Sequence, residues 1–285
     1  MPVVPFKEIL QDGFNNHYGV GAFNIINDLT LEAVLQAAEE MHSPIIVQTS
    51  VKTVKMIGVE VLFAMWTEMT RKMTVPACLH LDHCSDRAMI SACLAMGWGS
   101  VLFDASAMPL MENRRQTIEV VAEARQYQAG VEGEIEGIRN VDESLGSGSE
   151  TDRKTLEVSL EFIRATGIDC FAPAIGNAHG VYKETPRLDV QLVSNIVESQ
   201  PIPIALHGGT GLSDIQFKDL IARGCAKVNI STALKMAYMQ SNLKFLREAE
   251  ATNKWDPPSL FKHVNKDVKD MVIGYLQIFG SVGRA

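Results

Sequence analysis

The feature that most constrains the fold of this chain is a recurrence of eight strand-length apolar segments, separated by longer amphipathic stretches. None of them alternates polar and apolar residues, and several are rich in Val and Ile, which is typical of strands buried on both faces of a parallel sheet. The segments are residues 21–26, 44–49, 75–81, 100–105, 130–135, 170–175, 202–206 and 226–230.

Helix-length stretches fill the gaps between these segments. Asp28 or Thr30 can cap the stretch after the first segment, and Ser213 or Asp214 can cap the stretch that ends before Gly224. Eight strands alternating with helices predict an α/β fold in the form of a (β/α)8 TIM barrel. The alternative is an open doubly wound sheet, which normally has about five to seven strands.

Two stretches interrupt this alternation. Residues 137–152, after the fifth segment, are rich in Gly and Ser and too long for an ordinary turn, which indicates a lid, a binding loop or disorder. The tail after Lys254 holds a proline pair and an amphipathic run that caps the barrel or crosses to a second subunit. Because no repeat or linker is visible, we expect one domain over 1–285, with 257–285 as a C-terminal helical extension.

Composition and charge exclude several classes of protein. A chain with 46% hydrophobic and 21% charged residues is expected to fold. With 26 Lys and Arg against 34 Asp and Glu, and no basic run, it is not expected to bind nucleic acid. No apolar stretch is long enough to span a membrane, and we expect no secretory signal. Five scattered cysteines without a CxxC pair predict reduced thiols and a cytoplasmic location.

Three histidines, His83, His179 and His207, each follow a different strand candidate directly. In a barrel the carboxyl ends of the strands converge at one mouth, so these imidazoles are expected to meet there. Three histidines with an open fourth position are typical of a catalytic zinc site. The alternative, three separately satisfied polar residues, is less consistent with this placement, and His80 is expected either to support the site or to fill a barrel layer.

Asp82 precedes the proposed ligand His83, so it can be a ligand, an orienting group or a general base. It could instead cap the following helix, but Ser85 and Asp86 can supply that cap themselves. The Gly-rich turn 208–211 and the turn 229–232 follow the seventh and eighth segments, where barrels usually bind phosphate. Together these features predict metal-assisted chemistry on a phosphorylated substrate.

The motifs also resemble a known family over nearly the whole chain. They are GAFNI (21–25), HLDHC (80–84), FDAS (103–106), VEGEI (131–135), GNAHGVYK (176–183), LHGGTG (206–211), KVNIST (227–232) and FGSVGRA (279–285). In this order and spacing they resemble the class II, metal-dependent ketose-bisphosphate aldolases, which include the fructose- and tagatose-bisphosphate aldolases. The resemblance implies reversible cleavage of a ketose 1,6-bisphosphate, or a related ketose 1-phosphate, into dihydroxyacetone phosphate and an aldehyde.

The resemblance also implies a role for each matching residue. His83, His179 and His207 would bind one catalytic Zn²⁺ per subunit, with Asp104 and Glu134 near an alternative metal position, and Asp82 would exchange the proton of the C4 hydroxyl. The phosphate and the dihydroxyacetone phosphate half would be bound by Gly180, Lys183, Gly208, Gly209, Thr210, Asn229, Ser231 and Thr232. The other end of the sugar would meet Asn24, Gln48, Ser50 and, from a neighbouring subunit of a homodimer or homotetramer, Arg284. A monovalent cation near the phosphate is compatible with the resemblance.

Two departures from the family pattern leave alternatives open. The loop acid that moves the C3 proton falls on Asp142, or on Glu143 after a one-residue slip. The turn reads NISTA, where fructose-type members often read NIDTD and tagatose-type members NVATE, so Ser231 and Ala233 carry no acid. The Gln48 and Ser50 pair instead matches the fructose type, and the exact ketose stays undecided, a non-bisphosphate sugar or sugar-acid 1-phosphate included.

Three other functions fit these residues less well. A metal-dependent hydrolase of this fold would place an HxH pair at the first strand, where this chain has no histidine. A Schiff-base aldolase would need an inward lysine, and neither Lys183 nor Lys227 makes a convincing one. A non-catalytic sugar-phosphate-binding barrel would be expected to lack Asp82 or a metal ligand, yet all are present.

Overall fold

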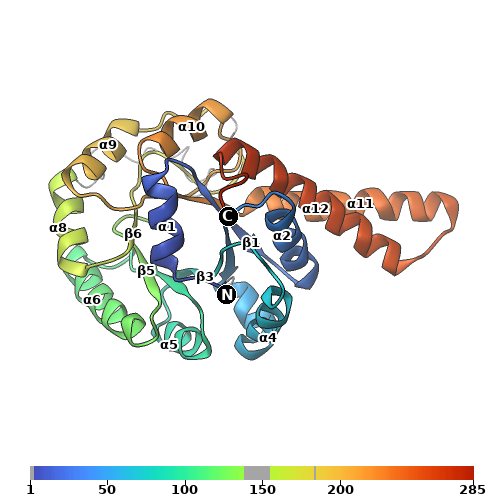
Figure 1. Cartoon of the computed structure of the whole chain (residues 1–285), viewed down its shortest axis with the longest axis horizontal. Helices are drawn as coiled ribbons and strands as arrows, with labels where there is room; N and C mark the ends of the chain where they lie inside the picture. The colour runs from blue at the N-terminus through green and yellow to red at the C-terminus, as the bar shows by residue number, and fades with distance from the viewer. Residues whose placement is uncertain (1–2, 138–154, 183) are drawn as a thin grey trace.

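The computed structural model describes residues 3–137, 155–182 and 184–285 of the chain, and eight parallel strands form its centre (Figure 1). Each apolar segment identified in the sequence overlaps one strand, which confirms the predicted fold class. The strands are β1 Val20–Ile25, β2 Ile45–Ser50, β3 Ala77–Cys84, β4 Ser100–Phe103, β5 Gly130–Glu134, β6 Cys170–Ala172, β7 Ala205–Leu206 and β8 Lys227–Ile230.

The strands close into a barrel rather than an open sheet. Their order is β6-β5-β4-β3-β2-β1-β8-β7, so every neighbour is also a neighbour in sequence except at the β1–β8 pair. The two ends of this order meet through a parallel bridge between Phe171 and Ile204. There the Phe171 N–H donates to the carbonyl of Pro203 at 3.1 Å. The doubly wound alternative is therefore excluded.

Strand β7 is shorter than predicted, because it covers only the end of the segment 202–206. Pro203 lies within that segment and has no N–H to donate to a sheet ladder. Strand β6 likewise ends at Ala172, before the predicted end at residue 175. The early ending of β6 leaves irregular backbone at the mouth of the barrel, where functional loops begin.

Helices surround the strands and cover their outer faces (Figure 1). They are α1 Phe6–Asn15, α2 Asp28–Glu40, α3 Val51–Ile57, α4 Val59–Thr70, α5 Arg87–Met96, α6 Leu110–Gln126, α8 Leu156–Thr166, α9 Val190–Ser199, α10 Asp214–Ala222, α11 Thr232–Thr252 and α12 Pro257–Phe279. No helix in the described part of the chain is long and apolar enough to cross a membrane.

Local capping explains where several of these helices begin. Asn27, not Asp28, is the N-cap of α2, and the side chain of Thr30 completes the box by accepting from the Asn27 N–H. Ser213 caps α10 as predicted, in a box with Gln216. Gly224 follows α10 at a φ of 117°, a backbone conformation that glycine adopts without a Cβ clash.

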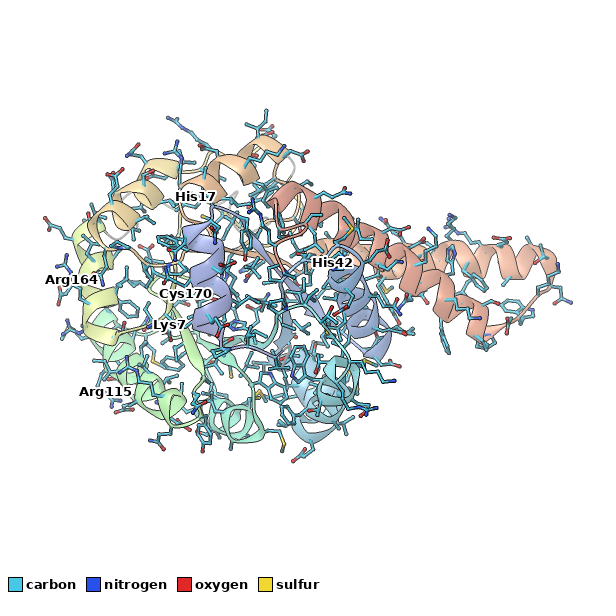
Figure 2. All side chains as sticks on the ribbon, in the orientation of Figure 1. Lys7, His17, His42, Arg115, Arg164 and Cys170 are labelled. Atoms are coloured by element: carbon cyan, nitrogen blue, oxygen red, sulfur yellow. The ribbon has the colours of Figure 1, made fainter. Side chains whose placement is uncertain are left out.

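The interior of the barrel is closed at one end by α1. Phe6 of α1 is fully buried and stacks on the ring of His80, with 5.4 Å between the ring centroids. Phe6 and Cys170 belong to one cluster of buried apolar residues, and Figure 2 shows Cys170 beside α1. Arg115 and Arg164 lie at the outer rim of the barrel in the same view. His80 therefore fills a layer of the barrel interior, one of the two roles expected for it.

Helices α11 and α12 form an antiparallel pair that projects from the barrel (Figure 1). The buried face of α12 is a stripe at helical spacing, made of Val264, Val268, Val272, Leu276 and Phe279. After α12 the chain returns to the amino-terminal ends of the strands, where the Gly283 N–H donates to the Met41 carbonyl at 3.0 Å. The predicted C-terminal helix is thus present.

Candidate active site

A cavity of about 1010 Å³ opens at the carboxyl ends of the strands. It gathers residues from the carboxyl ends of all eight strands or from the loops that follow them, as expected for a barrel of this class. Of the predicted site residues, the following line it: Asn24, Ser50, Asp82, His83, Asp104, His179, Gly180, Gly208, Gly209, Thr210, Asn229, Ser231 and Thr232.

A β-bulge lets two consecutive residues of β3 face this cavity. The register between β3 and β4 shifts between Leu81 and Cys84, and His83 has a φ of 45°. That left-handed conformation is strained for a residue with a Cβ, and such strain is characteristic of functional sites. Regular alternation would send Asp82 and His83 to opposite faces, but both line the cavity.

The three predicted histidines meet at the mouth of the barrel. The ring centroid of His83 lies 4.8 Å from that of His207 and 5.2 Å from that of His179. The centroids of His179 and His207 are 5.9 Å apart. The nearest ring nitrogens, Nε2 of His83 and Nδ1 of His207, are 3.0 Å apart. Two nitrogens on one tetrahedral Zn²⁺ would be separated by about 3.3 Å, so the residues fit this ion.

Carboxylates hold the outer nitrogens of two of these rings. His83 Nδ1 lies 2.9 Å from Asp104 Oδ2, and His207 Nε2 lies 2.6 Å from Glu132 Oε1. A carboxylate accepts only, so each outer nitrogen donates, and in the neutral ring the inner nitrogen is the one that can bind a metal. This arrangement, with an acceptor behind each ligand, is typical of metal-binding histidines.

The charges around the histidines also favour a cation. Burial alone would lower the pKa of His83, but the carboxylates of Asp82, Asp104 and Glu134 outweigh it and raise that pKa well above its usual value. Burial lowers the pKa of His179 to about 4, and the neighbouring histidines add to this effect. The site thus combines a neutral imidazole with an excess of negative charge nearby.

A second set of possible ligands overlaps the first, since His83, Asp104 and Glu134 also converge. Both carboxylate oxygens of Glu134 are buried and have no hydrogen-bond partner within the described residues. Burial raises the pKa of Glu134 to about 8. A divalent cation would satisfy these oxygens, which agrees with the alternative metal position expected for Asp104 and Glu134.

Asp82 is held by a short chain of amides. Its Oδ2 accepts from Asn24 Nδ2 at 2.7 Å, and Asn24 Oδ1 accepts in turn from Gln48 Nε2 at 2.9 Å. Burial would raise the pKa of Asp82, but the positive charge of His83 and Lys227 lowers it to about 2. Asp82 is therefore ionised, and its buried Oδ1 has no partner among the described residues.

Gln48 is placed differently from the expectation that it faces the sugar. It has no solvent exposure and lies behind Asn24 rather than on the cavity wall. Ser50 does line the cavity, but its hydroxyl also accepts from the Thr53 N–H at 3.2 Å and so caps α3. Any effect of Gln48 on a substrate would act through Asn24.

The two turns predicted to bind phosphate are joined to each other. The Thr210 hydroxyl accepts from the Ala233 N–H in the first turn of α11 at 3.1 Å. Gly208 has a φ of 65°, and a Cβ there would lie 2.2 Å from the Ala178 carbonyl oxygen. Only glycine allows this approach of the two loops. Residues at the N-terminus of α11 line the cavity.

Tyr182 was missed by the sequence reasoning although it stabilises these loops. Its hydroxyl accepts from the Ala178 N–H at 2.8 Å and donates to the Gly208 carbonyl at 3.0 Å. Lys52 and Lys235, also missed, line the cavity and are exposed. Nothing in a single sequence marks these surface-type residues as part of a site.

Four other predicted residues stand apart. Asp142, Glu143 and Lys183 lie outside the described residues. Arg284 lies at the opposite end of the barrel, with its guanidinium 5.8 Å from the centroid of the Tyr18 ring. In its own chain Arg284 therefore does not reach the cavity.

Comparisons with known proteins agree with this geometry. A family model described as fructose-bisphosphate aldolase class-II matches residues 4–284. A fructose-bisphosphate aldolase of Geobacillus stearothermophilus is 36% identical, and a sulfofructosephosphate aldolase of Alkalicoccus urumqiensis is 32% identical; each match covers 100% of this chain and 99% of the relative. The crystal structure of the YdjI aldolase from Escherichia coli K12 superposes with a TM-score of 0.86 at 31% identity, over 99% of both chains.

Proposed function

Since the chain belongs to the class II fructose-bisphosphate aldolase family, and is an aldolase, we propose that it uses a divalent metal ion to cleave a ketose 1,6-bisphosphate of the fructose or tagatose type, or a related ketose 1-phosphate. The products would be dihydroxyacetone phosphate and an aldehyde. The observation that carries this proposal is the convergence of the three histidines at the cavity beside Asp82, whose Oδ1 has no partner among the described residues.

In cleavage, Asp82 would take the proton of the C4 hydroxyl on Oδ1. As the C4 oxygen forms its carbonyl, the C3–C4 bond breaks and its electron pair stays on C3, conjugated with C2, as an enediolate. The Asn24 amide holds Asp82 by its other oxygen, which leaves Oδ1 aimed for this transfer. The loop carrying Asp142 and Glu143 would return a proton to C3 to give dihydroxyacetone phosphate.

His83, His179 and His207 would hold the metal, for which Zn²⁺ fits the nitrogen ligands. A bound divalent cation would act as a Lewis acid that polarises the ketose carbonyl and stabilises the enediolate charge. The role of the chain is to keep the ligand nitrogens in place, which Asp104 and Glu132 do through the outer nitrogens. The C1 phosphate would bind at Gly208, Gly209 and the N-terminus of α11.

The far end of the substrate would carry a second anionic group. Lys52 and Lys235 both line the cavity, and neither has a salt-bridge partner among the described residues. The two relatives named above differ by only four percentage points of identity and are named for two different ketoses. A terminal phosphate and a terminal sulfonate are both anions, so either would meet these lysines favourably.

We also propose that the protein is a homo-oligomer that works in the cytoplasm. The projecting helix α11 exposes an apolar stripe at helical spacing, made of Met236, Met239, Leu243 and Leu246, each between 40% and 65% exposed. A second copy would cover this stripe and bring its own residues near the cavity where α11 begins, Arg284 being the proposed contributor. The five cysteines are buried and free, which suits a reducing compartment.

The proposal is tested by measuring dihydroxyacetone phosphate release from these ketose bisphosphates before and after removal of divalent metal. Release that is lost with the metal and returns with Zn²⁺ supports it.

A further inference from the structure

A cluster of buried charged and polar side chains, made of Lys227, Glu132, His207 and Asn229, lies under the cavity. The reaction steps above give no role to Lys227 or Asn229. Lys227 Nζ, with no exposure, lies 2.7 Å from Glu132 Oε2 and 2.8 Å from Asn229 Oδ1. Glu132, also with no exposure, accepts from His207 Nε2 at 2.6 Å through its other oxygen. The ammonium thus connects a candidate metal ligand with a residue of the cavity wall.

The donors and acceptors in this cluster can be arranged in only one direction. An ammonium donates and never accepts, so the Asn229 atom that faces Lys227 must be the carbonyl oxygen. The Asn229 NH₂ group is therefore turned the other way, toward the cavity that Asn229 lines. On the other side, the Glu132 carboxylate only accepts, so His207 carries its proton on Nε2 and keeps a lone pair on Nδ1.

We propose that Lys227 is a positioning residue that fixes the hydrogen-bond direction of two site groups at once. Through Asn229 it presents N–H donors to an oxygen of the substrate. Through Glu132 it keeps His207 Nδ1 available to the metal. This inference rests on the proposed function for the identity of substrate and metal, but not for the hydrogen-bond directions themselves.

A purely structural role is the alternative. A buried ion pair is a weak source of stability, because desolvation of the two charges offsets their attraction, and apolar side chains of similar volume often replace it without loss. A cluster kept only for stability could therefore be made apolar without effect on the site. A positioning cluster could not be made apolar without effect, because the hydrogen-bond directions of Asn229 and His207 would be lost.

The deciding variant is Lys227→Met/Glu132→Met, which removes both charges and leaves neither unpaired. Its matched control is Ser43→Ala/Ser281→Ala, which removes another buried hydrogen-bonded pair, 2.8 Å apart, near the amino ends of the strands. The measurements are the melting temperature of the metal-free protein, the Zn²⁺ affinity by competition with a chromophoric chelator, the steady-state constants, and the ¹⁵N NMR signals of the histidine rings without metal.

For the Met/Met variant we expect Zn²⁺ affinity to fall about 10- to 100-fold. We also expect kcat/KM to fall and the Nε2-protonated signal of His207 to lose its preference, while the control stays like wild type. Wild-type zinc affinity, kcat/KM and ring signals in the folded Met/Met variant would overturn the proposal. The ring signals report on it even if the wild type releases no dihydroxyacetone phosphate, a result that would contradict the proposed function instead.

A second variant, Lys227→Met/Glu132→Gln, separates the two sides and serves if the first does not fold. The glutamine carbonyl can still accept from His207, so Zn²⁺ affinity should stay close to that of the wild type. Asn229 Oδ1 no longer accepts from the Lys227 ammonium, so the amide is free to turn. We therefore expect KM to rise about threefold or more with Zn²⁺ bound. An unchanged KM in this variant would contradict the role of Lys227.

Discussion

His83 Nε2 lies 3.0 Å from His207 Nδ1, while the opposite nitrogen of each ring is held by a carboxylate, Asp104 for one and Glu132 for the other. The two inner nitrogens thereby face each other from different strands. A metal ion could bind both nitrogens, and His179 offers a third. The geometry of the three histidines thus fits a metal ion, and Asp82 lies next to His83 in the sequence and lines the same cavity.

Replacing Asp82 should separate catalysis from metal binding. In Asp82→Ala we expect kcat to fall by about 10²–10⁴-fold, because a positioned acid/base contributes about that much, while the zinc content stays at the wild-type level. Asp86→Ala is the matched control, since Asp86 caps α5 and does not line the cavity. Steady-state assay and metal analysis check this, and near-wild-type turnover in Asp82→Ala would remove it from the mechanism.

Neutralising Lys235 should weaken binding of a doubly anionic substrate. In Lys235→Gln we expect KM to rise about two- to fivefold, the effect of one exposed charge contact, with kcat little changed. The rise should shrink at high salt, because exposed charges are screened. Lys244→Gln, also exposed and on α11 but not on the cavity wall, is the control. Equal KM values for the two variants would show that Lys235 does not meet the substrate.

Much of the fold was predictable because parallel barrel strands are buried on both faces and so leave continuous apolar segments. The site residues were predictable for a related reason, since the carboxyl ends of parallel strands converge and the three histidines lie at or beyond three of these ends. The N-cap of α2 was placed one residue late, because Asn27 and Asp28 are both good caps and only the backbone conformation distinguishes them.

The rest depended on contacts that sequence periodicity does not contain. Regular alternation along β3 would point the side chains of Asp82 and His83 to opposite faces of the sheet, and only the bulge brings both to the cavity. Gln48 and Asn24 share one face of neighbouring strands, so the sequence could not show that one covers the other. Nothing in the sequence pairs Lys227 with Glu132, because the two residues lie on strands β8 and β5, far apart in the chain.

His80 should make the metal-free protein sensitive to mild acid. Burial, with the charge of Lys227, lowers the pKa of His80 from 6.5 to about 3, so the folded state holds it neutral. Its contribution is fully present above pH 6.5 and is lost as pH falls toward 3, because the unfolded chain takes up the proton first. Between pH 7 and 5 this amounts to about 2 kcal/mol.

Urea unfolding of wild type and His80→Gln at both pH values, with a chelator present, checks this expectation. The wild type should lose about 2 kcal/mol more stability than the variant over this interval. His17→Gln, at an exposed position, should behave like the wild type. The same pH dependence in His80→Gln and wild type would show that His80 is not held neutral.

The exposed stripe on α11 should be an interface between two copies. In Leu243→Glu we expect dissociation to monomers, because a buried carboxylate at the centre of the stripe would lack a partner. Light scattering coupled to size-exclusion chromatography measures this at matched protein concentration. Lys244→Glu, the adjacent exposed position, is the control. A wild-type protein that is already monomeric would contradict the oligomer.

The most direct test of the account is dihydroxyacetone phosphate release by the zinc-loaded protein from fructose and tagatose 1,6-bisphosphates, with and without a chelator. His179→Ala, which removes one candidate ligand, and His17→Ala, which removes an exposed histidine, are assayed beside the wild type. The account predicts release from at least one ketose bisphosphate, lost with the chelator and in His179→Ala but kept in His17→Ala. Release that persists without metal would contradict it.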